Sequence, residues 1–286
     1  MLNDPIVIVG AARTPMAAFQ GDFATLVASD LGAVAIKAAV ERAGIKPDDV
    51  DKTIFGCVLP AGQGQAPARQ ASLKAGLPLA TGATTVNKMC GSAMEAAILA
   101  HDALIAGSSD IIVAGGMESM SQAPYLLPKA RSGYRMGHQQ VIDHMFMDGL
   151  EDAYDKGRLM GTFAEECADK YAFTREAQDA FAQASLARAL AANNDGTFGW
   201  EIAPVTVSGK KGDVVVDKDE QPAKAQPAKI PALKPAFAKD GTVTAANSSS
   251  ISDGAAALVL MRRSTAEQRG LKPIAVIVAH ATHAQK

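Results

Sequence analysis

One cysteine has neighbours that suit it to nucleophilic chemistry. Cys90 lies in the segment Val86–Met94 (VNKMCGSAM), where an extended run gives way to a helical pattern of small residues. The start of a helix presents unpaired N–H groups and a partial positive charge, which favour a thiolate over a thiol. A thiolate can attack a thioester carbonyl, and the backbone N–H of Cys90 could hold the resulting oxyanion. The alternative from these residues alone is a small, buried structural cysteine.

Two further segments contain residues that could bind a ligand. Gly115–Ser121 (GGMESMS) follows the apolar run Asp110–Ala114, and the carboxyl ends of strands in open α/β sheets are where ligands bind. Val243–Ala257 (VTAANSSSISDGAAA) offers small hydroxyl groups that could hydrogen-bond the amides of a long polar ligand. The alternatives are a tight turn with methionine packing for the first segment, and a serine-rich loop with an Asp-Gly turn for the second.

The elements that must position these segments alternate between strands and helices. Short apolar or β-branched runs predict strands at Ile6–Val9, Thr53–Leu59, Thr84–Lys88, Asp110–Ala114 and Ile274–Ala279. Helical spacing and small residues predict helices over about residues 30–43, 66–75, 91–106 and 175–193. This alternation predicts a largely parallel sheet covered by helices.

Local signals predict where several elements begin and end. Ser29 is expected to cap the first helix and Gly44 to end it, while Thr174 and Gly196 are expected to bound the helix over residues 175–193. The pair Gly115-Gly116 is expected to close its strand.

The strand signals fade between Glu118 and Lys239, which we interpret as an insertion. Thr162-x-x-Glu165 is a capping-box pattern that predicts the start of a short helix there. Residues 210–239 are rich in lysine, proline and alanine and are expected to be loop-like.

The composition excludes several classes of protein. The chain has 286 residues, 48% of them hydrophobic and 20% charged, with a net charge of -2. It is therefore not expected to be disordered, and it has no basic footprint for nucleic acid or a membrane surface. Three cysteines do not make a disulfide framework, no apolar run approaches the ~20 residues of a membrane span, and a signal peptide is not expected. We expect a cytoplasmic protein, with Cys57 and Cys167 in structural roles.

Four segments together resemble the thiolases. They are Val9–Pro15 (VGAARTP), Asn87–Ala93, Gly115–Ser121 and Asn247–Ala257, and they occur in this order. The resemblance implies a layered α/β fold of two similar βαβαβαββ halves, with a loop domain that binds coenzyme A inserted in the first. The first half would comprise residues 1–118 and 240–270, the loop domain 119–239, and residues 271–286 the first strand of a largely missing second half.

The resemblance also implies an activity. Cys90 would be the acylated cysteine of an acyltransferase that condenses acetyl-CoA, or cleaves a β-ketoacyl-CoA, with coenzyme A and acetyl-CoA as substrates. It implies a homodimer or homotetramer, with no permanently bound cofactor and no metal. Coenzyme A contacts carry over to Ser249, Ala245, Phe237, Met160 and Leu150. From the residues alone, the last three could equally be ordinary packing.

Some positions depart from the family pattern. Leu159 stands where acetoacetyl-CoA thiolases often have histidine, which leaves the acyl chain length open, and Lys224 is nearest to the family's loop arginine. The family's Asn-Glu segment, Gly-His-Pro histidine and Cys-x-Gly-Gly-Gly cysteine have no match up to Lys286, so the alternative is a coenzyme A-binding fragment without turnover. A ketoacyl synthase fits the inserted loop domain less well. The His-x-x-His spacing of His280 and His283 could indicate a metal site, but we expect surface or strand-end histidines, because no cysteine or acidic residue accompanies them.

Overall fold

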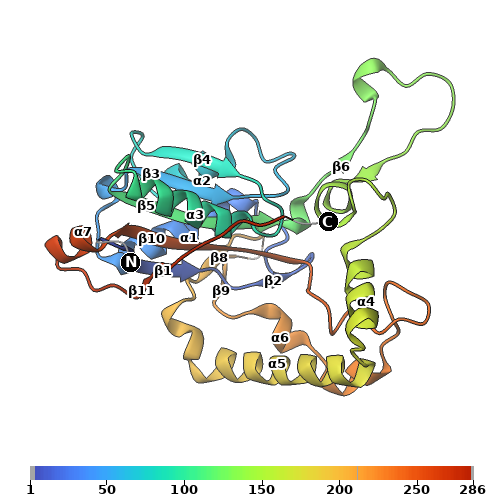
Figure 1. Ribbon diagram of the computed structural model, residues 1–286. Helices are drawn as coiled ribbons and strands as arrows, with labels where there is room; N and C mark the ends of the chain where they lie inside the picture. The colour runs from blue at the N-terminus through green and yellow to red at the C-terminus, as the bar shows by residue number, and fades with distance from the viewer. Residues whose placement is uncertain (1–3, 211, 285–286) are drawn as a thin grey trace.

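A seven-stranded sheet forms the centre of the computed structural model, which describes residues 4–210 and 212–284 (Figure 1). The strand order is β11-β1-β10-β5-β3-β4, and β2 pairs with β10. The strands are β1 (Ile6–Arg13), β2 (Ala17–Ala18), β3 (Lys52–Gly56), β4 (Gly82–Val86), β5 (Ile111–Ser119), β10 (Ser252–Arg262) and β11 (Ala275–Val276). Only β3 with β4 and β3 with β5 are parallel, while β10 is antiparallel to both β1 and β5. The predicted α/β class is confirmed, but the expectation of a largely parallel sheet is wrong.

Helices cover both faces of this sheet. They are α1 (Ala28–Ala43), α2 (Pro67–Lys74) and α3 (Ser92–Ile105), with the short α7 (Arg263–Gln268) after β10. Side chains alternate along each strand, so that Val7 and Phe55 belong to the core under α1 and α2, whereas Ile6 and Ile54 belong to the core under α3. Of the helices α1, α2, α3 and α7, only α3 covers the second face of the sheet.

The helix ends follow some of the local signals. Gly44 ends α1 with a left-handed φ of 70°, as predicted. The start of α1 differs, because the helix begins at Ala28 and the Asp30 carboxylate accepts a hydrogen bond from the Val27 N–H at 3.3 Å. Ser29 is instead buried in the helix and accepts a hydrogen bond from Lys74.

The paired glycines of β5 do not close the strand. β5 continues through Gly115 and Gly116 to Ser119. A Cβ on Gly115 would lie 2.0 Å from the carbonyl oxygen of Ala256, and one on Gly116 would lie 2.7 Å from Ala93 Cβ. These glycines therefore permit close approach of a strand on one side and of α3 on the other.

The chain between β5 and β10 contains further helices and two small antiparallel sheets. They comprise β6 (Tyr125–Leu126), β7 (Ile142–Asp143), a π-helix (Phe146–Leu150), α4 (Met160–Tyr171), α5 (Arg175–Asp195), β8 (Val205–Val207), β9 (Val214–Val216) and α6 (Glu220–Lys224). Figure 1 shows α4, α5 and α6 beside the central sheet and away from its helix layers. The domain boundaries stay a prediction, and their residues 1–3, 211, 285 and 286 lie outside the described part of the chain.

Two capping signals in the chain between β5 and β10 have different outcomes. Thr174 Oγ accepts the Ala177 N–H at 3.2 Å and Gly196 ends α5 with a φ of 86°, as predicted. The pattern at Thr162 is not a cap, because α4 already begins at Met160. Glu165 instead accepts hydrogen bonds from the backbone of residues 242 and 243, so it ties α4 to the segment before β10. Across the described ranges, no helix combines the length and the apolar character needed to cross a bilayer.

Candidate functional site

A short loop between β4 and α3 carries Cys90. Cys90 is exposed to solvent and lies immediately before Gly91, the N-cap residue of α3. The loop turns at Met89, which has a left-handed φ of 49°, and the Asn87 side-chain oxygen accepts the Met89 N–H at 2.9 Å. Ser92 Oγ donates to the Met89 carbonyl at 2.5 Å and accepts the Lys88 N–H at 2.8 Å. These bonds hold the turn in a conformation that a non-glycine residue rarely adopts.

Glycines let the first turn of α3 sit directly on the sheet. A Cβ on Gly56, the last residue of β3, would lie 2.6 Å from Ser92 Cβ and 2.8 Å from the Ala93 nitrogen. Gly116 on β5 makes the matching close approach to Ala93. The start of the helix, and with it Cys90, is therefore placed by backbone contact with two strands.

The loop after β3 contains the second cysteine of this region, in the opposite environment. Cys57 is buried, and its Sγ lies 3.6 Å from a Glu118 carboxylate oxygen. Glu118, on β5, accepts hydrogen bonds from the backbone N–H groups of Val58 at 2.8 Å and Leu59 at 3.0 Å. Burial, followed by the nearby Glu118 charge, raises the pKa of the Cys57 thiol to about 12, and burial also raises the pKa of Glu118. Cys57 is thus a protonated structural thiol, while the third cysteine, Cys167, is exposed on α4.

One side chain links the two loops. Asn87 Nδ2 donates to the Val58 carbonyl at 3.3 Å, while its oxygen holds Met89. The carboxylate of Glu118 therefore orders the 57–59 loop, and that loop in turn supports the turn before Cys90. Asn87 and Glu118 both lie within segments that the sequence singles out, but no local pattern shows which backbone groups their side chains reach.

A cavity of about 740 Å³ lies between α5 and the chain before β10. Its lining is largely apolar with several hydroxyl and amide groups. Its lining includes Phe181, Lys229, Leu233, Ala245, Ser248 and Ser249. Such a mixed surface suits a flexible ligand with an apolar arm and a few polar anchors.

Hydrogen bonds from α5 build the walls of this cavity. The buried Asp179 pairs with Arg175 at 2.7 Å and accepts from Asn247 Nδ2 at 3.0 Å. The Asn247 oxygen accepts the Thr244 N–H at 2.7 Å, which bends the 244–249 loop towards α5. Arg175 also donates to the Leu233 carbonyl at 2.9 Å and so fixes the opposite wall.

The structure separates the predicted site residues into four places. Ser249 and Ala245 line the cavity. Phe237 packs its ring on the start of α4, where a Cβ on Gly161, next to Met160, would lie 2.4 Å from the ring. Leu150 is half-buried at the end of the π-helix, and Cys90 is not among the residues lining the cavity. Their roles as coenzyme A contacts stay predictions.

The lysine that lines the cavity is Lys229, whereas the sequence suggested Lys224. Lys224 forms an ion pair with Glu220 one helical turn earlier. Lys229 instead lines the cavity. No spacing signal distinguishes these two lysines in a proline- and lysine-rich segment, and only the path of the chain after α6 does.

Comparisons with known proteins show the family to which the chain belongs. Residues 6–264 match the family model described as thiolase, N-terminal domain. Acetyl-CoA acetyltransferase from Cupriavidus necator is 50% identical over 278 residues, which cover 96% of this chain and 70% of that protein. Acetyl-CoA acetyltransferase 1 from Arabidopsis thaliana is 50% identical over 284 residues, 98% of this chain and 68% of that protein. The solved structure of acetyl-CoA acetyltransferase from Syntrophomonas wolfei superposes with a TM-score of 0.90 at 44% identity, over 94% of this chain and 68% of that one.

Proposed function

This chain belongs to the thiolase family, and from its site we propose that it transfers acyl groups between coenzyme A and carbon through an acyl-cysteine at Cys90. The observation that carries the proposal is the exposed Cys90 at the start of α3, placed by glycine contacts with two strands. The alternative of a coenzyme A-binding fragment is not favoured, because relatives of about 50% identity bear the name acetyl-CoA acetyltransferase.

The first half-reaction uses groups that the loop presents. The Cys90 sulfur attacks the acyl carbon of an acyl-CoA, the bond from that carbon to the coenzyme A sulfur breaks, and coenzyme A leaves as a thiolate that takes up a proton. We assign the backbone N–H of Cys90 to the oxyanion formed on the way. The half-charge at the start of α3 favours the anionic oxygen that forms during the attack.

The second half-reaction makes a carbon–carbon bond. A base removes a proton from the α-carbon of acetyl-CoA, and the resulting carbanion displaces the Cys90 sulfur to give a β-ketoacyl-CoA. The reverse sequence is thiolysis, in which coenzyme A cleaves the β-ketoacyl-CoA.

The cavity beside α5 supports coenzyme A as the substrate carrier. Ser249 and Ala245 lie on its wall. We propose that these two residues and Phe237 contact the pantetheine arm, with Met160 at the acyl end and Leu150 beside the cofactor. Lys229 supplies a positive charge for the phosphate-bearing end. We also propose a cytoplasmic homodimer or homotetramer, as for the family.

Acylation of the purified chain tests the proposal. We expect incubation with acetyl-CoA to add one acetyl group, seen by intact mass spectrometry and mapped to the peptide containing Cys90. Cys90→Ala should abolish the label, while Cys167→Ala, which removes another exposed thiol, should retain it. Acetylation that persists in Cys90→Ala would overturn the assignment of the nucleophile.

A further inference from the structure

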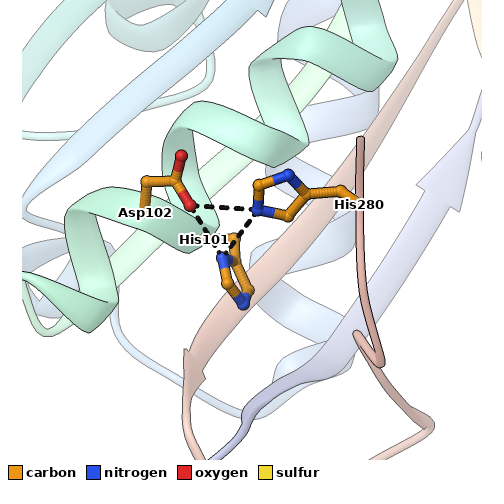
Figure 2. A group of neighbouring side chains, drawn as sticks. All are labelled: His101, Asp102 and His280. Atoms are coloured by element: carbon orange, nitrogen blue, oxygen red, sulfur yellow. Dashed lines mark hydrogen bonds and ion pairs between the residues drawn. The ribbon is translucent and has the colours of Figure 1, made fainter. Parts of the chain in front are cut away.

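Three side chains, of residue types that commonly bind metal ions, converge on one point beside α3. His101 Nδ1 lies 3.0 Å from Asp102 Oδ1 and 3.2 Å from His280 Nε2, and that His280 atom lies 3.0 Å from the same Asp102 oxygen. Figure 2 shows the two rings and the carboxylate turned towards a common centre, with His101 and Asp102 from α3 and His280 from the chain after β11. These three residues form a potential metal-ligand group within the described chain.

The protein fixes the positions of all three groups. His101 is buried on the sheet-facing side of α3, and Asp102 follows it towards solvent. The segment carrying His280 is held to β1, because the Ile277 N–H donates to the Ile6 carbonyl at 3.0 Å and Ile277 packs on the core under α3. A site formed in this way needs little rearrangement to bind an ion.

The distances fit a tetrahedral ion. Donor atoms about 2.0 Å from a tetrahedral zinc are separated by about 3.3 Å, which is close to the three separations observed here. The rings meet edge to face at 81°, so their nitrogen lone pairs can point to one centre without stacking.

We propose that His101, Asp102 and His280 bind a divalent transition-metal ion, with zinc as the occupant. Two imidazole nitrogens and one carboxylate oxygen are ligands that zinc prefers, and the half-exposed Asp102 side chain leaves a fourth position open to water. His280 is exposed, as the sequence predicts, but Asp102 from α3 lies beside it in space. His283, its partner in the His-x-x-His spacing, is not in the group.

The ion would connect the end of the described chain to the loop of Cys90. Two residues after His280, Thr282 Oγ accepts a hydrogen bond from Lys88 Nζ at 3.0 Å. Lys88 lies two residues before Cys90, in the same loop. An ion that ties His280 to α3 therefore also stabilises this contact beside the nucleophile.

Zinc binding to tag-free chain tests the proposal. The parent protein should carry Cys90→Ala, which removes an exposed thiol that could bind zinc itself. Competition with a chromogenic chelator should show one equivalent bound, and both His280→Ala and Asp102→Asn should weaken binding by at least about 10-fold. Both positions are partly exposed, so these variants should keep the fold, which circular dichroism checks.

His283→Ala is the matched control, because it removes an exposed histidine three residues along the same segment. It should bind zinc like the parent, and zinc should slow hydrogen exchange at residues 278–284 in both. Absence of one-equivalent binding would overturn the proposal. Unchanged zinc affinity in His280→Ala would also overturn it. An equal loss of zinc affinity in His283→Ala would overturn it as well, because the ion would then be bound by residues 278–284 alone.

Discussion

Two neighbouring loops follow parallel strands of this sheet, and each contains a cysteine, yet the two sulfurs have opposite properties. The loop after β3 turns inwards and buries Cys57 against Glu118, whereas the loop after β4 turns outwards and exposes Cys90 before α3. The surroundings of each cysteine, and not the residue type, cause this difference. A carboxylate anchors the first loop, and the second loop leads directly into a helix.

Alkylation should give the largest contrast between the loops. With iodoacetamide in mildly alkaline buffer, we expect Cys90 to react at least about 100-fold faster than Cys57, because burial and Glu118 raise the pKa of the Cys57 thiol to about 12. Peptide mapping by mass spectrometry measures both rates. Cys167, exposed on α4, reports an ordinary accessible thiol, and denaturation in urea should equalise all three. Equal rates in the folded chain would contradict the comparison.

Adding one methyl group at the end of β3 should move the reactive loop. Gly56→Ala would place a Cβ 2.6 Å from Ser92 Cβ and 2.7 Å from the Ser92 backbone, so we expect a loss of about 1–3 kcal/mol in the free energy of unfolding. Urea denaturation measures this loss, and acetylation of Cys90 should slow with it. Gly199→Ala is the control, because nothing lies within 4 Å of its Cβ position. A Gly56→Ala chain of unchanged stability and reactivity would show that α3 is not placed by this contact.

The anchoring carboxylate should give a smaller, pH-dependent effect. Burial raises the pKa of Glu118 above its ordinary value of 4.5. The protonated side chain therefore makes its full contribution to the free energy of unfolding when the pH is below 4.5. This stability is lost as the pH rises through the folded pKa. Glu118→Gln, which leaves one backbone N–H poorly paired, should therefore lower the free energy of unfolding by about 1–2 kcal/mol in acid, and by less at neutral pH.

Denaturation of wild type and Glu118→Gln across this pH range isolates the effect, because other titrating groups cancel in the difference. Glu95→Gln is the control, since its ion pair with Lys88 is partly exposed and should change stability by no more than about 0.5 kcal/mol. A difference that grows with pH would contradict the assigned direction of the Glu118 pKa.

How far the sequence predicted this region depends on the range of the interactions. Thr174 and Gly196 bound α5 as expected, and Cys90 precedes a helix as expected, because short-range signals decide these features. The antiparallel direction of β10 was not predictable, because it depends on pairs such as Asp253 with Ser119, far apart in sequence. Adjacent glycines are equally consistent with a turn and with close approach, and only the neighbouring strand and helix distinguish the two.

The same reasoning applies to the ligand cavity. Its serine-rich wall was visible in the sequence, but the wall is bent by Asn247 against Asp179 on α5, and no local pattern joins these residues. Lys229 faces the cavity and Lys224 does not, for the same reason.

The smallest effect concerns the hydroxyl that holds the Cys90 turn. Ser92→Ala removes the bonds to the Met89 carbonyl and the Lys88 N–H, so we expect a loss of about 1 kcal/mol and slower acetylation. Adding Met89→Gly should recover part of the stability, because glycine adopts the left-handed φ of 49° without strain. Acetylation should stay slow, since the loop has still lost its anchor. If the double variant recovered both, the hydroxyl would serve only to offset backbone strain, and the contrast with the Glu118-anchored loop would rest on burial alone.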